Sequence, residues 1–206
     1  MKKHHTLSIQ LFKKLNGLVP LNERIQEFLY EHITGNYYAD DEVLFQPKDK
    51  SKEVFYLSSG TAVLYIFDPA GNKQVLEIYQ AGDIIFNVSH ALQPSAPCYL
   101  AACADTYMLR MAYDKVIELN RNFPETEDLS RKLLAAKEIK NLWRNKILIM
   151  PGIRKVEAFY KQYAELLPPG KVMRDAEIAS FLLLAEGSFR ALRNRLLQAG
   201  TLRTGN

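Results

Sequence analysis

The first half of the chain alternates short apolar runs with turns that contain glycine. Thr61–Phe67 and Gln74–Tyr79 are rich in β-branched, aromatic and aliphatic residues, which favour strands. The glycines beside them, Gly60, Gly71 and Gly82, are spaced eleven residues apart and allow the positive φ angles that tight turns need. This repeat of strand and turn predicts a small β-barrel or jelly roll, which usually surrounds a pocket.

The apolar positions that precede these strands follow a helical spacing instead. Near the N-terminus they recur every three or four residues, which predicts an amphipathic helix. Asn22 is a candidate N-cap of a second helix that reaches Ile33, and Gly35 fits its end. The remaining strands that the pattern predicts are Val43–Phe45, Val54–Leu57, Asp83–Val88, Tyr99–Ala104 and Tyr107–Met111.

From Tyr113 the pattern is helical, and Pro124 separates a first helix from a long one at about Glu125–Met150. The long helix carries an apolar stripe at alternating spacings of three and four, interrupted by Lys140. Such a seam is typical of a two-helix dimer, in which a polar seam residue fixes the register; packing on the chain's own barrel is the alternative. The predicted dimer seam consists of Leu129, Leu133, Ala136, Trp143, Ile147 and Met150.

Beyond the long helix, Pro151 and Gly152 form a hinge, and a further helix is expected over 153–167. From Asp175 onward, the apolar spacing matches the shared core of a helix-turn-helix. The turn position that glycine normally takes is Leu183, which would cost about 1–2 kcal/mol if its φ were positive. The expected core residues of this motif are Ile178, Ala179, Leu182, Leu184, Phe189 and Leu192.

The second helix of the motif is expected over Glu186–Gln198 and is a candidate recognition helix for the DNA major groove. Arginine suits guanine edges and phosphates, and asparagine suits adenine. A surface helix with ordinary arginines is the alternative. Gly187 and Ala191 are poor base readers, so weak sequence specificity is expected. The predicted DNA-binding residues are Ser188, Arg190, Arg193, Asn194 and Arg195.

Charge is concentrated where this motif lies. Residues 151–206 hold nine basic and five acidic side chains, which accounts for the whole formal net charge of +4. A polyanion partner is therefore expected for this region, with a solvated arginine face as the alternative.

No apolar run approaches the roughly 20 residues of a membrane span. Cys98 and Cys103 have an odd spacing in one predicted strand and should not pair, which is typical of a reduced, cytoplasmic protein.

Taken together, from about Leu21 to Gly200, these parts resemble the cyclic-AMP receptor protein/FNR (Crp/Fnr) family of bacterial transcription regulators. The resemblance implies an α+β fold with an N-terminal double-stranded β-helix, a jelly roll of the cyclic-nucleotide-binding type, over 1–123. It implies a dimerisation helix over 124–150 and a helix-turn-helix DNA-binding domain over 151–206. Only six residues follow Gly200, so the β-wing that usually follows is expected to be truncated. A cytoplasmic homodimer that binds DNA is the implied function.

The effector pocket departs from the family pattern. In members that bind cyclic nucleotides, a Phe-Gly-Glu motif holds the ribose and a later arginine holds the phosphate. Here Asn87 and Val88 follow Phe86, and Pro97 falls near the arginine position. We therefore expect no tight binding of cyclic AMP or cyclic GMP; the pocket is either empty or takes an unknown uncharged or hydrophobic molecule. The predicted pocket residues are Phe86, Asn87, Val88, Ser89, Pro97 and Cys98.

Other functions find less support in the sequence. Two cysteines are too few for a four-cysteine iron–sulfur cluster, and His90 is the single histidine of the predicted barrel, so neither a haem nor a metal site is expected. No catalytic constellation is apparent, which argues against an enzyme. The alternative to a DNA-binding regulator is a ligand-binding or scaffolding protein of the same fold that no longer binds DNA specifically.

Overall fold

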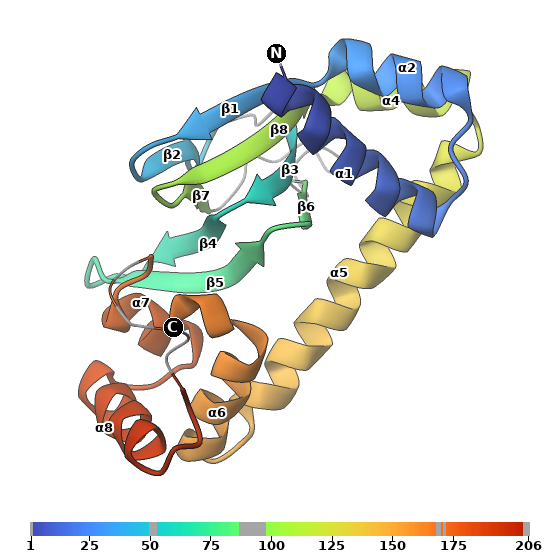
Figure 1. Ribbon diagram of the computed structural model, residues 1–206. Coiled ribbons are helices and arrows are strands. Elements are labelled where there is room, and N and C mark those ends of the chain that lie inside the picture. Colours follow the sequence, from blue (N-terminus) through green and yellow to red (C-terminus); the bar gives the residue numbers. More distant parts are fainter. Residues whose placement is uncertain (1, 50–52, 87–97, 168–169, 171, 204–206) are drawn as a thin grey trace. The chain divides into compact units, whose positions relative to one another are not determined.

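A computed structural model of the chain describes residues 2–49, 53–86, 98–167, 170 and 172–203. By its internal contacts the chain divides into two compact units (Figure 1). The first unit comprises Met1–Leu64 and Ile78–Ala136, and the second comprises Tyr65–Glu77 and Lys137–Asn206.

The strands form two four-stranded sheets in the described part of the chain, with the orders β1-β8-β3-β6 and β2-β7-β4-β5. The pairs β1/β8, β3/β8, β3/β6 and β2/β7 are antiparallel. Two such sheets with non-sequential strand order form a jelly-roll-like arrangement, so the predicted α+β class is confirmed. The strands are β1 (Thr34–Tyr38), β2 (Glu42–Phe45), β3 (Glu53–Ser59), β4 (Thr61–Phe67), β5 (Lys73–Gln80), β6 (Ile84–Ile85), β7 (Tyr99–Ala102) and β8 (Thr106–Ala112).

Strand β1 was not predicted, and Gly35 does not end a helix. It lies within β1, opposite Leu109 of β8. A Cβ atom at Gly35 would come within 2.2 Å of the Tyr107 hydroxyl oxygen. Glycine at this position therefore allows β1 to pack closely against β8. In the sequence, a glycine with this role looks the same as a glycine that ends a helix. β6 is shorter than predicted, and residues 87 and 88 of that prediction lie outside the described residues.

The predicted helices of the N-terminal half are present in the first unit. α1 (Lys2–Leu18) and α2 (Glu23–His32) contribute Leu11, Leu15 and Leu29 to a buried cluster with the sheet residues Tyr56 and Leu109. Asn22 caps α2 as predicted, because its side-chain oxygen accepts a hydrogen bond from the backbone N–H of Ile25 at 2.9 Å. Figure 1 shows α1 beside β3 and α2 beside α4.

The helices of the C-terminal half also follow the expected order. The helix predicted over 153–167 is divided, because the α-helix ends at Gln162 and a short 3₁₀ segment follows. Among the described residues no helix combines the length and apolarity needed to cross a membrane. The elements are α4 (Tyr113–Asn122), α5 (Thr126–Leu148), α6 (Gly152–Gln162), η1 (Ala164–Leu166), α7 (Asp175–Phe181) and α8 (Glu186–Gln198).

The evenly spaced glycines adopt the backbone conformation that the sequence predicts. Gly60, Gly71 and Gly82 have φ angles of 88°, 83° and 94°. Gly60 is also closely packed, because a Cβ atom there would lie 2.4 Å from the Thr106 side-chain oxygen and 2.7 Å from its Cα. That oxygen accepts a hydrogen bond from the backbone N–H of Thr61 at 3.1 Å and donates one to its carbonyl at 3.0 Å. The turn is thus tied to the buried end of β8.

Gly60→Ala should therefore destabilise the protein more than Gly71→Ala. Both variants place a Cβ at a positive φ, which costs roughly 1–2 kcal/mol. Gly71 has no other atom within 4 Å of the added Cβ, whereas Gly60 also collides with the Thr106 backbone. Urea unfolding of the two variants measures the difference, and equal losses of stability would contradict the close packing of Gly60 against Thr106.

Candidate nucleic-acid interface and effector pocket

In the second unit α8 packs against both α6 and α7, and Phe181 of α7 lies beside Phe159 of α6. Ile178, Ala179 and Leu182 are buried, and so is Phe189 of α8, as the sequence predicts. Leu184 and Leu192 are partly buried. The sequence did not reveal the contribution of α6, whose Tyr160 ring centre lies 6.3 Å from that of Phe189. The core of the helix pair is therefore shared among three helices.

Leu183 lies in the turn between α7 and α8 and has a φ angle of 53°. The predicted strain required a positive φ at this position, and Leu183 has one. The leucine therefore occupies a backbone conformation that normally favours glycine. Burial of the Leu183 side chain offsets little of this conformational cost, since the residue is 63% exposed. The turn keeps the geometry that connects the two helices despite this local strain.

An acidic residue at the start of α7 holds α8 through two arginines. Asp175 accepts hydrogen bonds from both terminal nitrogens of Arg193, with a distance of 3.2 Å from Nη2 to Oδ2. Arg190 Nε donates to the same Oδ2 at 2.9 Å, and Arg190 Nη2 donates to Glu186. The Arg193 side chain is only 8% exposed, whereas the Arg190 side chain is 57% exposed. The Asp175–Arg193 pair is thus an internal connection between α7 and α8.

The pair shifts the ionisation of both groups. Burial by itself raises the pKa of Asp175, but the hydrogen bonds and charges of Arg193 and Arg190 outweigh this effect, and the pKa is lowered. Burial likewise opposes the charge of Arg193, yet the contact with Asp175 raises its pKa. Both groups are therefore held in their charged forms at neutral pH.

The prediction that Arg193 contacts DNA is wrong for this structure. Its guanidinium group lies inside the second unit, where it pairs with Asp175 and stacks 5.3 Å from the Phe189 ring centre. Helical spacing places an arginine on one face of α8, but it does not tell whether an acidic residue 18 positions earlier covers that face. The other predicted DNA-binding residues, Ser188, Arg190, Asn194 and Arg195, are exposed.

The predicted dimer seam is also corrected, because its face of α5 is packed within the chain. Leu129 and Leu133 belong to the apolar cluster of the first unit. Ile147 is buried, and the Trp143 ring centre lies 5.8 Å from that of Tyr163 in the second unit. Only Ala136 of the predicted seam is exposed, and Met150 is partly buried. The alternative, a helix packed on its own chain, therefore describes this face.

A second apolar stripe on α5 remains exposed in the single chain. Ile139 is 67% exposed, Leu142 58% and Ile149, just beyond the helix, 85%. With Ala135 and Lys146 these residues repeat at alternating spacings of four and three, so the stripe has the same heptad signature as the buried one. The sequence contained this signal, but spacing does not reveal which of two overlapping stripes the chain covers.

Most of the predicted effector pocket falls outside the described residues, namely Asn87, Val88, Ser89 and Pro97. The two predicted residues that flank this segment are described. Phe86 follows β6 and is partly buried, and Cys98 precedes β7, is buried and forms no disulfide. Cys103 is also buried, and the two cysteines do not form a disulfide, as the sequence predicts.

Comparisons with known proteins agree with this architecture. Residues 36–122 match the family of cyclic nucleotide-binding domains. The structure of FixK2 from Bradyrhizobium japonicum has a TM-score of 0.66 at 18% identity, over 82% of this chain and 86% of that chain. The catabolite activator protein of Thermus thermophilus has a TM-score of 0.51 at 18% identity, over 94% and 91%. The c-di-GMP-responsive regulator CLP of Xanthomonas campestris has a TM-score of 0.62 at 12% identity, over 87% and 93%.

A comparison with curated protein sequences finds no match. The domain match and the structural likeness together confirm the resemblance to the Crp/Fnr family that the sequence shows. At these identities the likeness establishes the fold, while the chemistry of the sites has to be argued from this chain's own residues.

Asp175→Ala should destabilise the protein by about 3 kcal/mol, because it leaves the buried Arg193 charge without its partner. Arg190→Ala is the matched control, since it removes the exposed partner of the same carboxylate and should cost less than about 1 kcal/mol. Thermal and urea unfolding measure both variants. A loss of stability for Asp175→Ala no larger than that for Arg190→Ala would contradict an internal role for the Asp175–Arg193 pair.

The same pair predicts a dependence of stability on pH. Because the pKa of Asp175 is lowered in the folded protein, its contribution is fully present above its unfolded pKa of about 4. The contribution is lost as the pH falls through the lowered, folded-state value. Urea unfolding at several pH values between 6 and 3 should therefore show the difference between the wild-type protein and Asp175→Ala shrinking below pH of about 4.

Proposed function

We propose that this protein is a dimeric, DNA-binding transcription regulator of Crp/Fnr type, in which α7 and α8 form the helix-turn-helix. The observation that carries the proposal is the exposed surface of α8, which presents Ser188, Asn194 and Arg195 while the Asp175–Arg193 pair fixes the helix on α7. A regulatory role also agrees with the likeness to FixK2, catabolite activator protein and CLP. No enzymatic activity is proposed.

The exposed surface of α8 carries only a few side chains that can bind DNA. Arg195 is exposed and pairs with no acidic side chain in the part of the chain that the structure describes. Asn194 is exposed beside it and can donate to and accept from an adenine edge. Arg190 shares its charge with Asp175 and Glu186, and Arg193 is internal. We therefore expect modest sequence specificity, supplied by Asn194 and Arg195.

The exposed stripe of α5 supplies the proposed dimer contact in place of the predicted seam. Ile139, Leu142 and Ile149 expose apolar surface that a second α5 helix can bury, and Lys146 is the polar residue within the stripe that can fix the register. The opposite face of α5 is occupied by the chain's own core. Pairing through the exposed stripe thus leaves the packing within each chain unchanged.

The effector that binds inside the roll is proposed to be something other than a cyclic nucleotide. No lysine or arginine lies between Lys73 and Arg110, so the segment that follows Phe86 offers no cation for a phosphate. Val88 likewise cannot accept a hydrogen bond from a ribose hydroxyl. The residues present do not fit a cyclic nucleotide, although the domain matches the family named for one.

Arg195→Ala should weaken DNA binding by about 1–3 kcal/mol if the guanidinium reaches a base edge. If it contacts a phosphate instead, the loss should be uniform across sequences, with a salt dependence shallower by about one charge. Arg154→Ala is the matched control, because it removes an equal charge from an exposed position on α6. Gel-shift titrations of genomic fragments at low and moderate salt measure the effect.

The same titration of the wild-type protein decides between the two candidate functions. Binding that falls steeply as salt rises supports the regulator. Absence of binding at low salt would favour a ligand-binding or scaffolding protein of the same fold, for which the strained Leu183 and the internal Arg193 provide the structural argument.

Leu142→Asp should dissociate the dimer, because it places a charge in the middle of the proposed contact. Asn141→Asp is the control, since it introduces the same charge on the neighbouring residue, which lies off the stripe. Sedimentation velocity measures the mass of each variant. An unchanged dimer for Leu142→Asp, or a monomeric wild-type protein, would refute pairing through this stripe.

Isothermal titration calorimetry with cyclic AMP and with cyclic GMP should detect no binding to the wild-type protein. The reason is the missing phosphate and ribose partners in the segment between Phe86 and Cys98. Micromolar binding of either nucleotide would falsify the proposed loss of this chemistry.

A further inference from the structure

The second unit contains a β-hairpin as well as helices. Tyr65–Glu77, which is the end of β4, the turn after it and the start of β5, groups with α6, α7 and α8. The turn is held by Asp68, whose carboxylate accepts hydrogen bonds from the backbone N–H groups of Ala70 at 2.9 Å and Asn72 at 2.8 Å. The hairpin therefore has a defined shape of its own in the unit that contains the proposed helix-turn-helix.

Two polar contacts join this hairpin to α7. Lys73 Nζ lies 2.6 Å from Glu177 Oε1, and the two side chains are 28% and 14% exposed. The backbone N–H of Val75 donates to the Ser180 hydroxyl oxygen at 3.0 Å. Glu177 and Ser180 are three residues apart on α7 and therefore share the helix face that meets the hairpin.

The contacts use groups at the edge of a sheet and at the start of α7. β5 is the outer strand of its sheet in the described part of the chain, so the outward N–H of Val75 has no neighbouring strand, and Ser180 provides the acceptor. Glu177 uses its other carboxylate oxygen to accept a hydrogen bond from the backbone N–H of Arg174 at 2.8 Å. Lys73 is thus linked to the carboxylate that caps α7.

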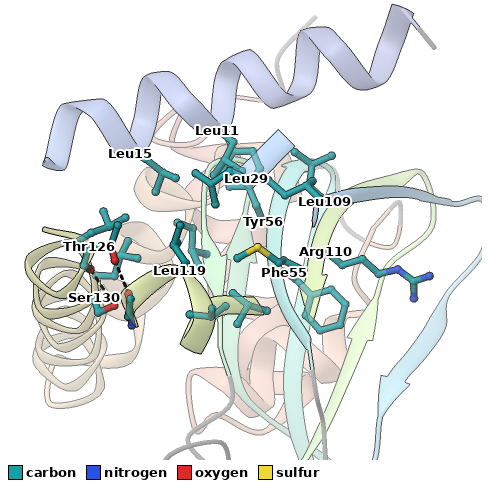
Figure 2. Close-up of a pocket in the computed structure, with 18 residues that line it drawn as sticks. Leu11, Leu15, Leu29, Phe55, Tyr56, Leu109, Arg110, Leu119, Thr126 and Ser130 are labelled. Atoms are coloured by element: carbon teal, nitrogen blue, oxygen red, sulfur yellow. Dashed lines mark hydrogen bonds between the residues drawn. The ribbon is translucent and has the colours of Figure 1, made fainter. Parts of the chain in front are cut away.

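Hollows in the two units differ in size and lining. One in the first unit is about 100 Å³ and is lined mainly by apolar side chains, among them Leu11, Leu15 and Leu29 (Figure 2). A hollow in the second unit is about 810 Å³, and its lining comes from the hairpin, from α7, from the turn after α7 and from the start of α8. The residues that border it include Phe67, Lys73, Arg174, Leu183, Ala185 and Glu186.

The helix ends that border the larger hollow are those that would approach DNA. In a helix-turn-helix, the N-terminal residues of the second helix contact bases in the major groove, and the first helix crosses the backbone. A helix about 10–12 Å across already fills a major groove about 12 Å wide, so an element beside the first turn of α8 would collide with the walls of the groove. The hairpin is such an element, because it lines the same hollow as Ala185 and Glu186.

We propose that this hairpin is an autoinhibitory latch, in which Lys73 and Val75 hold α7 so that the hairpin blocks the approach of DNA to α8. The inference rests on the proposed DNA binding by α7 and α8. Release of the two contacts frees the helix ends, and the affinity of the protein for DNA is reduced by the fraction of molecules in which they are closed. The ion pair is partly exposed, so its release requires only a small change in free energy.

Lys73→Ala should tighten DNA binding about two- to five-fold, because it removes a partly exposed ion pair from the closed state. The loss of a lysine would by itself weaken binding to a polyanion, so the two effects have opposite signs. Lys161→Ala is the matched control, since it removes the same charge from a pair with Glu157 within α6. Gel shifts with genomic fragments measure both variants, and unchanged or weaker binding by Lys73→Ala would refute the latch.

Ser180→Ala releases the second contact without a change of charge and should also tighten DNA binding. Hydrogen exchange of the Val75 amide, followed by NMR, reports on the latch without DNA. That amide should exchange faster in Lys73→Ala than in the wild-type protein, because loss of the ion pair opens the neighbouring hydrogen bond to Ser180. Equal exchange rates would overturn the coupling of the two contacts on which the latch depends.

A locked hairpin gives the opposite test. In a Lys73→Cys/Glu177→Cys variant, a short bis-maleimide should join the two residues and abolish DNA binding, whereas a monofunctional maleimide should not; Cys98 and Cys103 are buried. Undiminished binding after cross-linking would overturn the proposal. Absence of DNA binding by the wild-type protein, Lys73→Ala and Ser180→Ala alike would refute the proposed function and the inhibitory role with it, whereas equal binding by all three refutes the inhibitory role alone.

Discussion

The structure depends on α5, a single helix with two apolar faces. One face supplies Leu129 to the core of the first unit and Ile147 to the second, so burial of this face stabilises both units. The other face exposes Ile139 and Leu142. The second copy of the helix that we propose as its partner would match both the spacing and the apolar character of that side.

Internal packing also decides which side chains of α8 are left on its surface. A buried arginine needs a carboxylate, because an unpaired charge in the interior is costly. Asp175 meets that need for Arg193, and in doing so fixes α8 on α7. The arginine that holds the helix in place is thereby removed from the surface, and the proposed DNA contacts are left to Asn194, Arg195 and, in part, Arg190. The proposed regulator therefore combines a well-anchored helix pair with a sparse recognition surface.

The jelly-roll unit matches a family named for cyclic nucleotides, but its sequence lacks the charge that such a ligand needs. Residues 36–122 match the cyclic nucleotide-binding domains, yet no lysine or arginine lies between Lys73 and Arg110 to pair with a phosphate. A signal that acts through the roll is therefore expected to be uncharged.

Local sequence determined the elements and their order, because strand propensity, helical spacing and turn glycines act over a few residues. Thr61–Phe67 and Glu186–Gln198 have the predicted bounds, and Gly60, Gly71 and Gly82 have the positive φ angles that their spacing indicated. Only the tertiary structure decided which apolar stripe of α5 is covered and whether Arg193 reaches solvent. Both depend on partners distant in sequence, namely the cores of the two units and Asp175, and periodicity along one helix contains no information about what packs against it.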